Sequence, residues 1–337
     1  MIPAFTPAFG LYTHIQANRR RSILLIVALF ALVHALSFAG ALLAGAFASE
    51  GDLATLLREA RQSALTAAPF VSAATLAWIA LAWVFNRRIL ALAVPDHALE
   101  RAQAPDLHDI VETLCISRGM TTPRLAILET PEPNAFASGV TDAQYTITFT
   151  RGLLDLLTRD ELEAVAAHEL THIRNGDVRM MVIAMIIAGI VTFFAEMLFR
   201  LLGEGRGWRW GRGSPGGDAR EDRGRGGGAA AIALALLIVA AAWALSLMIR
   251  LALSRTREFL ADAGSAELTK NPDAMISALR KIAGKGELPG APSGVMEMCL
   301  DNPRSGFADL FSSHPSIEDR IAALARYAGG RDAPQPA

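Results

Sequence analysis

The sequence predicts a mainly α-helical membrane protein, with four transmembrane helices and a cytoplasmic α+β domain that contains a small sheet. Two observations predict this class. Hydrophobic residues make up 52% of the 337 residues, and many of them lie in four apolar stretches. Each stretch is long enough to cross a bilayer, which takes about 20 residues. The other observation concerns the segments between and after these stretches. They contain a polar, helix-forming motif at 168–172 and, at 143–150, a run rich in β-branched and aromatic residues.

The four apolar stretches cover residues 22–48, 64–85, 178–202 and 229–249. The first contains no Asp, Glu, Lys or Arg. A signal peptide is the alternative interpretation of this stretch. However, it is longer than the apolar part of a signal peptide, and no clear small-residue cleavage site follows it. We therefore expect a retained anchor and a multi-pass protein in contact with the lipid bilayer.

Basic residues beside the first two stretches predict the orientation. Three arginines at positions 19–21 precede the first stretch, and Arg87 and Arg88 follow the second. Because short cytoplasmic segments are rich in Lys and Arg, the N-terminal segment 1–21 and the segment 86–177 are predicted to be cytoplasmic. Two further spans return the segment 250–327 to the same side.

The segment 203–228 disagrees with this topology. It is rich in glycine, and its arginines outnumber its acidic residues, so the same rule places it in the cytoplasm. We keep four spans because early spans usually dominate, and we expect a flexible linker here and a disordered tail over 328–337. A lipid or nucleic-acid contact is the alternative for the linker, although a net charge of −1 gives no general indication of nucleic-acid binding.

An acidic residue, Glu196, lies within the third apolar stretch. A buried acid in a membrane span is a functional candidate. It is also four residues before Arg200, so an ion pair along one helix face is the simpler interpretation.

The sequence H-E-x-x-H at His168, Glu169 and His172 indicates a metal site. On a helix, residues four apart share a face, so both imidazoles can reach one cation and the glutamate can reach a water beside it. This pattern is typical of catalytic zinc. The flanking residues predict a helix that is capped by Asp160 and that stops at the Asn-Gly pair 175–176.

A third ligand is expected from the segment 254–269, which follows the fourth apolar stretch. It reads as a helix with Glu258 and Asp262 on one face. Glu258 can complete a three-ligand site for one Zn²⁺ per chain, and Asp262 can accept a hydrogen bond from a ligand histidine. The alternative is a non-catalytic membrane scaffold with structural zinc, but structural zinc usually has four protein ligands.

Two further regions offer substrate contacts. Residues 143–150 are rich in β-branched and aromatic residues and predict a strand, whose exposed edge could bind an extended peptide. An ordinary core strand is the alternative. His314 and Arg320 could donate hydrogen bonds to a substrate carbonyl or its oxyanion. Alternatively, His314 begins a helix and Arg320 is solvated.

The two cysteines, Cys115 and Cys299, are too few for a disulfide framework and lie far from the histidine motif in sequence. We expect both to be buried as small apolar residues.

The motifs together resemble one family. HELTHIRNGD at 168–177 and SRTREFLADA at 254–263 are similar to HtpX-type membrane metalloproteases, which are related to the CAAX prenyl endopeptidases. PNAFASG at 133–139 resembles the segment that leads into the active-site edge strand, and FSSHPSIEDRI at 311–321 resembles a C-terminal His-Pro motif. The resemblance covers most of the chain, although 203–228 and the tail look expanded.

This resemblance implies a zincin-like (gluzincin) catalytic domain and a membrane zinc endopeptidase. It implies Glu169 as general base, and substrate or transition-state binding by His314 and Arg320. It also implies a substrate strand formed by Asn134, Ala135, Phe136 and Ala137. The expected substrates are damaged or misfolded membrane proteins in stress-related quality control, with self-cleavage, at the cytoplasmic face of a bacterial inner membrane. A prenyl-protein endopeptidase is the alternative, but those relatives have more spans.

Overall fold

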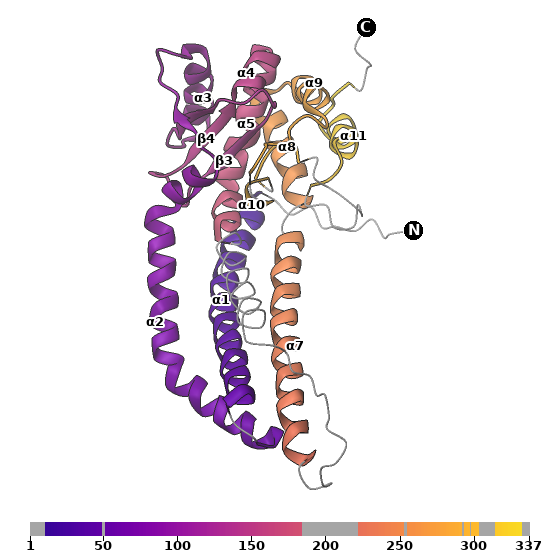
Figure 1. Cartoon of the computed structure of the whole chain (residues 1–337). Helices are drawn as coiled ribbons and strands as arrows, with labels where there is room; N and C mark the ends of the chain where they lie inside the picture. Colours follow the sequence, from indigo (N-terminus) through magenta and orange to yellow (C-terminus); the bar gives the residue numbers. More distant parts are fainter. Residues whose placement is uncertain are drawn as a thin grey trace. The chain divides into compact units, whose positions relative to one another are not determined.

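The structure is a computed structural model that describes residues 11–48, 51–183, 222–252, 255–291, 293–296, 298–302 and 314–331. The chain divides into two compact units. The helical unit comprises Leu24–Ala82 and Ala184–Ile249, and the α/β unit comprises Met1–Ile23, Trp83–Ile183 and Arg250–Ala337. Figure 1 shows the helices and strands of both.

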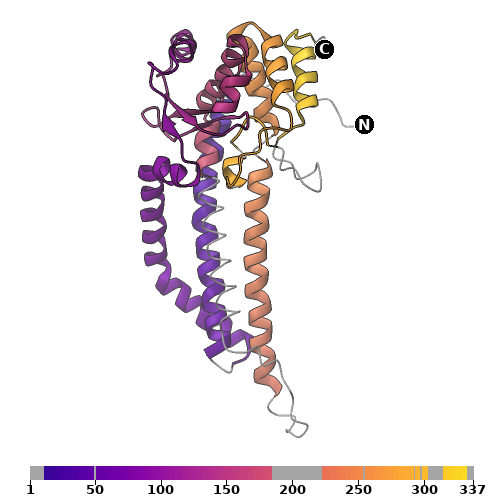
Figure 2. The same cartoon turned by 45° about the horizontal axis from the view of Figure 1, so that its top comes forward.

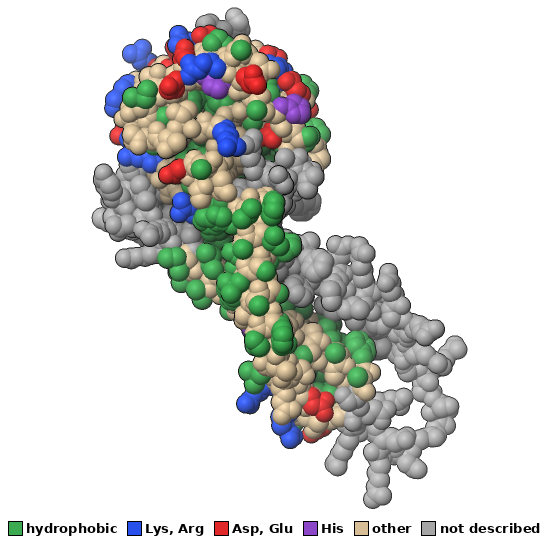
Figure 3. All heavy atoms as spheres, turned by 90° about the vertical axis from the view of Figure 1, so that its left-hand side faces the viewer, with side chains coloured by type: hydrophobic (Ala, Val, Ile, Leu, Met, Phe, Trp, Pro, Cys, Tyr) green, Lys and Arg blue, Asp and Glu red, His purple; other side chains and the backbone are tan. Residues whose placement is uncertain are grey.

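The helical unit contains segments of α1 (Leu11–Ala48), α2 (Leu53–Ala93) and α7 (Asp222–Ala252). Three stretches within these helices are long and apolar enough to cross a membrane: Ile23–Ala48, Leu53–Phe85 and Gly227–Leu245. Large apolar side chains of α2 are exposed, and hydrophobic side chains gather over the long helices in Figure 3. Such a surface suits lipid, and the chain is a multi-pass membrane protein.

Packing inside the helical unit combines leucines with alanines. Its buried core consists of Ala39, Leu42, Leu43, Leu56, Ala60, Ala231 and Ala235, which come from all three helices. Small residues allow membrane helices to approach closely. A polar contact also joins α1 to α2, where His34 Nε2 lies 3.1 Å from Ser72 Oγ.

The three described helices extend beyond the predicted spans 22–48, 64–85 and 229–249. Residues 53–63, which the sequence placed between the first two spans, are already helical, and Asp52 Oδ1 accepts the N–H of Thr55 at 3.0 Å at this helix start. Helix α7 includes the predicted span 229–249. The third predicted span lies outside the described residues from position 184 onwards, as do Glu196 and Arg200.

The α/β unit contains a four-stranded sheet in the order β1-β2-β4-β3. The strands are β1 (His97–Ala98), β2 (Arg124–Leu128), β3 (Ala135–Ser138) and β4 (Thr146–Thr150). Strands β2 and β4 are parallel, and the other neighbours are antiparallel. The predicted strand 143–150 is therefore an interior strand, not the edge, because β3 pairs with its outer side. The segment that resembles an active-site edge strand does form an edge.

Helices pack around this sheet. They are α3 (Pro105–Arg118), α4 (Arg151–Leu156), α5 (Arg159–Asn175), α8 (Arg255–Thr269), α9 (Pro272–Ile282), α10 (Ser293–Met296) and α11 (Ile317–Tyr327). Helix α5 contacts β3, α3, α8 and α9, so it is the centre of the unit, and Figure 2 shows α8 beside it. The histidine motif thus lies on a helix that other elements of the unit surround.

Helix α5 begins two residues earlier than the sequence predicted. Its N-cap is Thr158 and not Asp160, and the carboxylate of Glu161 accepts the Thr158 N–H at 2.7 Å. The same carboxylate also accepts from Ser277 and Lys281 of α9. The predicted stop is confirmed, because Gly176 has a φ of 73° and ends the helix in the left-handed region that glycine favours.

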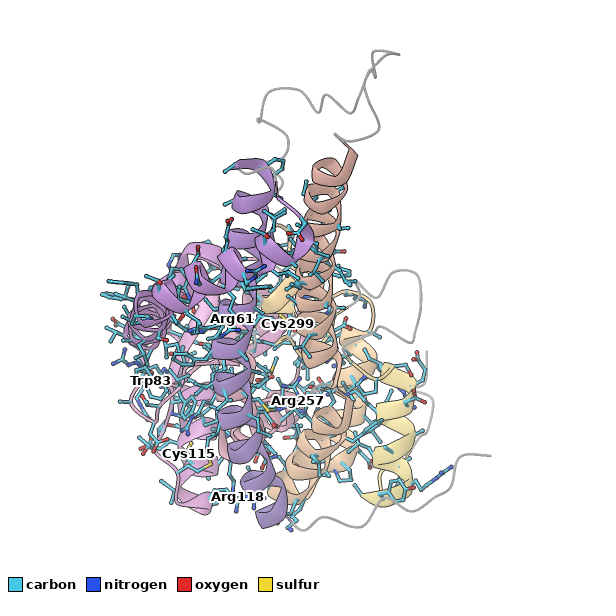
Figure 4. All side chains as sticks on the ribbon, turned by 90° about the horizontal axis from the view of Figure 1, so that it is seen from below. Arg61, Trp83, Cys115, Arg118, Arg257 and Cys299 are labelled. Carbon is cyan, nitrogen blue, oxygen red and sulfur yellow. The ribbon has the colours of Figure 1, made fainter. Side chains whose placement is uncertain are left out.

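Both cysteines are buried free thiols, as expected. Figure 4 shows Cys115 and Cys299 apart from each other. Burial raises the pKa of the Cys115 thiol to about 11, so this side chain stays a neutral, apolar core group.

Candidate metal centre

Three buried side chains converge in the α/β unit. The Nε2 atoms of His168 and His172 lie 3.1 Å apart, and carboxylate oxygens of Glu258 lie 3.6 Å from the first and 3.7 Å from the second. One donor atom from each residue falls within 4.8 Å of the other two. A tetrahedral zinc ion with bonds of about 2.0–2.2 Å separates its ligands by about 3.3–3.6 Å. The donor set and its spacing therefore fit zinc.

A glycine brings the two ligand-bearing helices together. A Cβ on Gly264 of α8 would lie 2.5 Å from Thr171 Cγ2 and 2.6 Å from Thr171 Oγ1 on α5. The next residue, Ser265, donates its hydroxyl to the carbonyl of Ala164 at 2.6 Å. This close packing holds Glu258 of α8 against the histidines of α5.

Each histidine of the cluster faces a second carboxylate with its other ring nitrogen. Nδ1 of His168 lies 3.0 Å from Asp262 Oδ1, and Nδ1 of His172 lies 3.0 Å from Asp177 Oδ2. A carboxylate that accepts the Nδ1 proton leaves the Nε2 lone pair for a metal. Asp262 had been predicted for such a position. Asp177 had been missed, although it ends the motif string five residues after His172.

Arg320 lies behind this arrangement. Its Nε and Nη2 donate to the two carboxylate oxygens of Asp262 at 2.8 and 2.7 Å, and its Nη1 donates to the Leu300 carbonyl at 2.9 Å. The side chain is only 1% exposed, so it is not the solvated arginine of the alternative interpretation. Burial alone would raise the pKa of Asp262, but the Arg320 guanidinium holds it below its usual value.

His314 also reaches the cluster. Its Nδ1 lies 3.6 Å from Glu258 Oε2, and the residue is buried. The residues just before it in the predicted His-Pro motif, 311–313, lie outside the described residues. The structure thus gathers His314 and Arg320 at the same carboxylates that the sequence had assigned to the metal site.

Glu169 is a buried carboxylate without a donor. It is 1% exposed, and neither of its oxygens has a hydrogen-bond partner in the described part of the chain. Burial raises the pKa of its carboxyl group, while His168 and His172 oppose this shift. A raised pKa and two unbound oxygens suit a group that accepts and returns a proton.

The predicted substrate strand is buried rather than exposed. Asn134 donates through Nδ2 to the carbonyls of Gly286 and Asp301, at 2.6 and 2.8 Å. The carbonyl of Ala135 accepts the N–H of Leu300 at 3.0 Å. Another segment of the chain therefore already pairs with the first part of β3.

The chain belongs to peptidase family M48, whose sequence pattern matches residues 101–328. It is a membrane metalloprotease, and the matched range contains the histidine motif and all three donor residues of the cluster. This confirms the family that the motifs at 168–177 and 254–263 indicated.

Similar proteins carry the name "Protease HtpX homolog". The one from Bacteroides fragilis (strain YCH46) is 34% identical over 328 residues, covering 94% of this chain and 99% of that protein. The one from Listeria innocua serovar 6a is 41% identical over 239 residues, covering 68% and 77%. A crystal structure of S. mikatae Ste24p is 19% identical, with a TM-score of 0.43, and the match covers 74% of this chain and 55% of that chain.

Proposed function

We propose that this protein is a zinc-dependent endopeptidase, with one zinc ion per chain held by His168, His172 and Glu258. The observation that carries the proposal is the convergence of these three donors, at zinc-ligand spacing, beside the unpartnered carboxylate of Glu169. Three protein ligands leave a position for water or substrate, as in catalytic zinc sites. Zinc bound there supplies Lewis acidity, which acidifies a water and polarises a carbonyl.

The protein groups then divide the work of peptide hydrolysis. Glu169 accepts a proton from the attacking water and returns it to the leaving amine nitrogen as the C–N bond breaks. His314 donates a hydrogen bond to the oxyanion that develops on the scissile carbonyl. These roles need a buried proton acceptor and a donor at the cluster, and both side chains lie there.

The outer carboxylates and the arginine act as positioning residues. Asp262 and Asp177 fix the ring orientation of His168 and His172. Arg320 holds Asp262 through two parallel hydrogen bonds, a geometry that fixes a carboxylate firmly. We therefore assign Arg320 a positioning role through Asp262 rather than a primary role at the oxyanion.

We further propose that the substrates are damaged or misfolded membrane proteins, in quality control at a bacterial inner membrane. The similarity to proteins named "Protease HtpX homolog" over nearly the whole chain supports this.

We propose four spans, a zincin-like catalytic domain in the cytoplasm, and self-cleavage. Reporter fusions within 203–228 test the topology: a cytoplasmic signal there contradicts it.

The experiment that tests the chemistry is Glu169→Gln in purified, zinc-loaded protein. Casein cleavage is expected to fall by about 10²–10⁴-fold, since the proton acceptor is lost, while zinc content stays that of the parent. Glu163→Gln, on the same helix, is the matched control and should cleave like the parent. Equal cleavage by Glu169→Gln and the parent would reject this mechanism. A parent that holds zinc but cleaves nothing would favour the structural-zinc scaffold.

A further inference from the structure

Residues 298–301 lie along the outer edge of β3. Phe136 and Cys299 form an antiparallel bridge, and the N–H of Leu300 donates to the carbonyl of Ala135 at 3.0 Å. Phe136 and Ala135 are completely buried, and Leu300 is 1% exposed. The main-chain position that an added strand would take on this edge is therefore filled by the protein itself.

The other main-chain group of Leu300 is also bound. Its carbonyl accepts a hydrogen bond from Arg320 Nη1 at 2.9 Å. The same guanidinium donates to the carboxylate of Asp262, which faces His168. Leu300 thus places its N–H on the edge strand and its carbonyl on the Arg320 guanidinium, which binds the carboxylate beside His168. An extended peptide bound across a protease site presents the same two groups.

We propose that residues 298–301 are a resident pseudosubstrate. They occupy a peptide-binding site with two anchors for main-chain groups, the Ala135 carbonyl and the guanidinium Nη1 of Arg320. A substrate peptide binds when this segment leaves the edge, and it takes over the same two hydrogen bonds. The inference rests on the proposed function in one respect, namely that the site serves peptide hydrolysis.

The contacts of the segment suit such an exchange. Both bonds use the main-chain N–H and carbonyl of Leu300, so any extended peptide can replace them one for one, whatever its sequence. The end of the segment is held more firmly, because Asp301 accepts from Asn134 Nδ2 through its carbonyl and from the Gly286 N–H through Oδ2, at 2.8 and 3.1 Å. We therefore assign Asp301 and Asn134 as the anchor about which residues 298–300 move.

A reversible disulfide tests whether the segment must move. Ala135→Cys and Leu300→Cys are combined with Cys115→Ser and Cys299→Ser. Facing residues of antiparallel strands have Cα separations of about 4.5–5.5 Å, within the range for a disulfide. Binding of a fluorescein-labelled unfolded casein peptide is measured in zinc-loaded protein that also carries Glu169→Gln, so that no cleavage interferes. The oxidised form should bind about tenfold more weakly than the reduced form of the same protein.

A releasing variant tests the opposite direction. Leu300→Pro removes the N–H that Ala135 accepts, and Leu300→Ala removes the side chain but keeps the N–H. Because one such hydrogen bond is worth about a fivefold change in an equilibrium, the Pro variant should bind the peptide about fivefold more tightly than the Ala variant.

The outcomes separate this inference from the proposed function. Equal peptide binding by the oxidised and reduced forms overturns the pseudosubstrate, as does weaker binding by Leu300→Pro than by Leu300→Ala. The two proposals can also fail separately. If the parent cleaves no peptide, the peptidase function is wrong. The occupied peptide site is still supported in that case if the oxidised disulfide form does not bind the peptide and reduction restores binding.

Discussion

Gly264 sets the distance between the two helices that carry the metal ligands, and Gly264→Ala should push them apart. The new Cβ would lie 2.5 Å from Thr171 Cγ2, 2.6 Å from Thr171 Oγ1 and 3.1 Å from Thr171 Cβ. Carbon atoms prefer about 3.5–4.0 Å, so α5 and α8 must separate by about 1 Å. Rotation of Thr171 gives little relief, since both branches of its side chain are close, and Oγ1 also donates to the Ala167 carbonyl at 2.8 Å.

The magnitude combines two opposing effects. Overpacking of this kind costs about 3 kcal/mol, and alanine regains about 1 kcal/mol of helix propensity over glycine, so the net loss is about 2 kcal/mol. The effect on zinc should be larger, because metal sites tolerate displacements of only about 0.2 Å and Glu258 moves with α8. Gly40→Ala is the matched control, since its Cβ would meet nothing within 4 Å, and it should be neutral or gain about 1 kcal/mol.

The assay is denaturant unfolding of the purified protein, together with zinc dissociation measured by chelator competition. Thr171→Ala removes both close atoms, so the double variant Gly264→Ala/Thr171→Ala should recover most of the stability and zinc affinity that Gly264→Ala loses. The reasoning is refuted if Gly264→Ala binds zinc as tightly as the parent, or if the two substitutions are simply additive.

Three further predictions concern the ligands and the cap of the motif helix. Glu258→Ala should lower bound zinc in metal analysis, because one of three ligands is lost; unchanged zinc would place the third ligand elsewhere. Asp177→Ala should weaken zinc binding about 10–100-fold in chelator competition, and Asp177→Asn less, because it keeps an acceptor oxygen for His172; parent-like affinity of Asp177→Ala would remove its positioning role. Burial raises the pKa of Glu161, but hydrogen bonds from Lys281, Ser277 and the Thr158 N–H outweigh it and hold the pKa below the usual value of 4.5. Its contribution to stability is therefore complete above pH 4.5 and lost as the pH falls through the lower folded pKa. Glu161→Gln should cost about 1–2 kcal/mol at pH 7 and less as the pH falls below 4.5, and a cost in unfolding experiments that does not change with pH would contradict this.

The histidine motif and its third ligand could be found from the sequence because each is a local pattern. Residues four apart share a helix face whatever surrounds the helix. The spacing of His168 and His172, like that of Glu258 and Asp262, therefore predicts that the two side chains point in the same direction. The apolar stretches are equally local, since their length and composition suffice for a membrane span. The same spacing argument could not place Asp177 beside His172. Asp177 follows the turn at Gly176, and helix periodicity ends at that turn.

The sequence by itself thus determined the family, and it predicted three apolar stretches that the structure describes as long helices and three residues that lie together as candidate metal donors. Tertiary structure decided which groups meet those donors. Arg320 belongs to α11 and Asp262 to α8, and only their packing shows that the arginine holds a ligand-orienting carboxylate. The occupied edge of β3 likewise depends on Leu300, far along the chain from Ala135. The physical reason is that side-chain periodicity fixes directions within one element, whereas contacts between distant segments depend on how the whole unit buries its apolar surface and satisfies its buried polar groups.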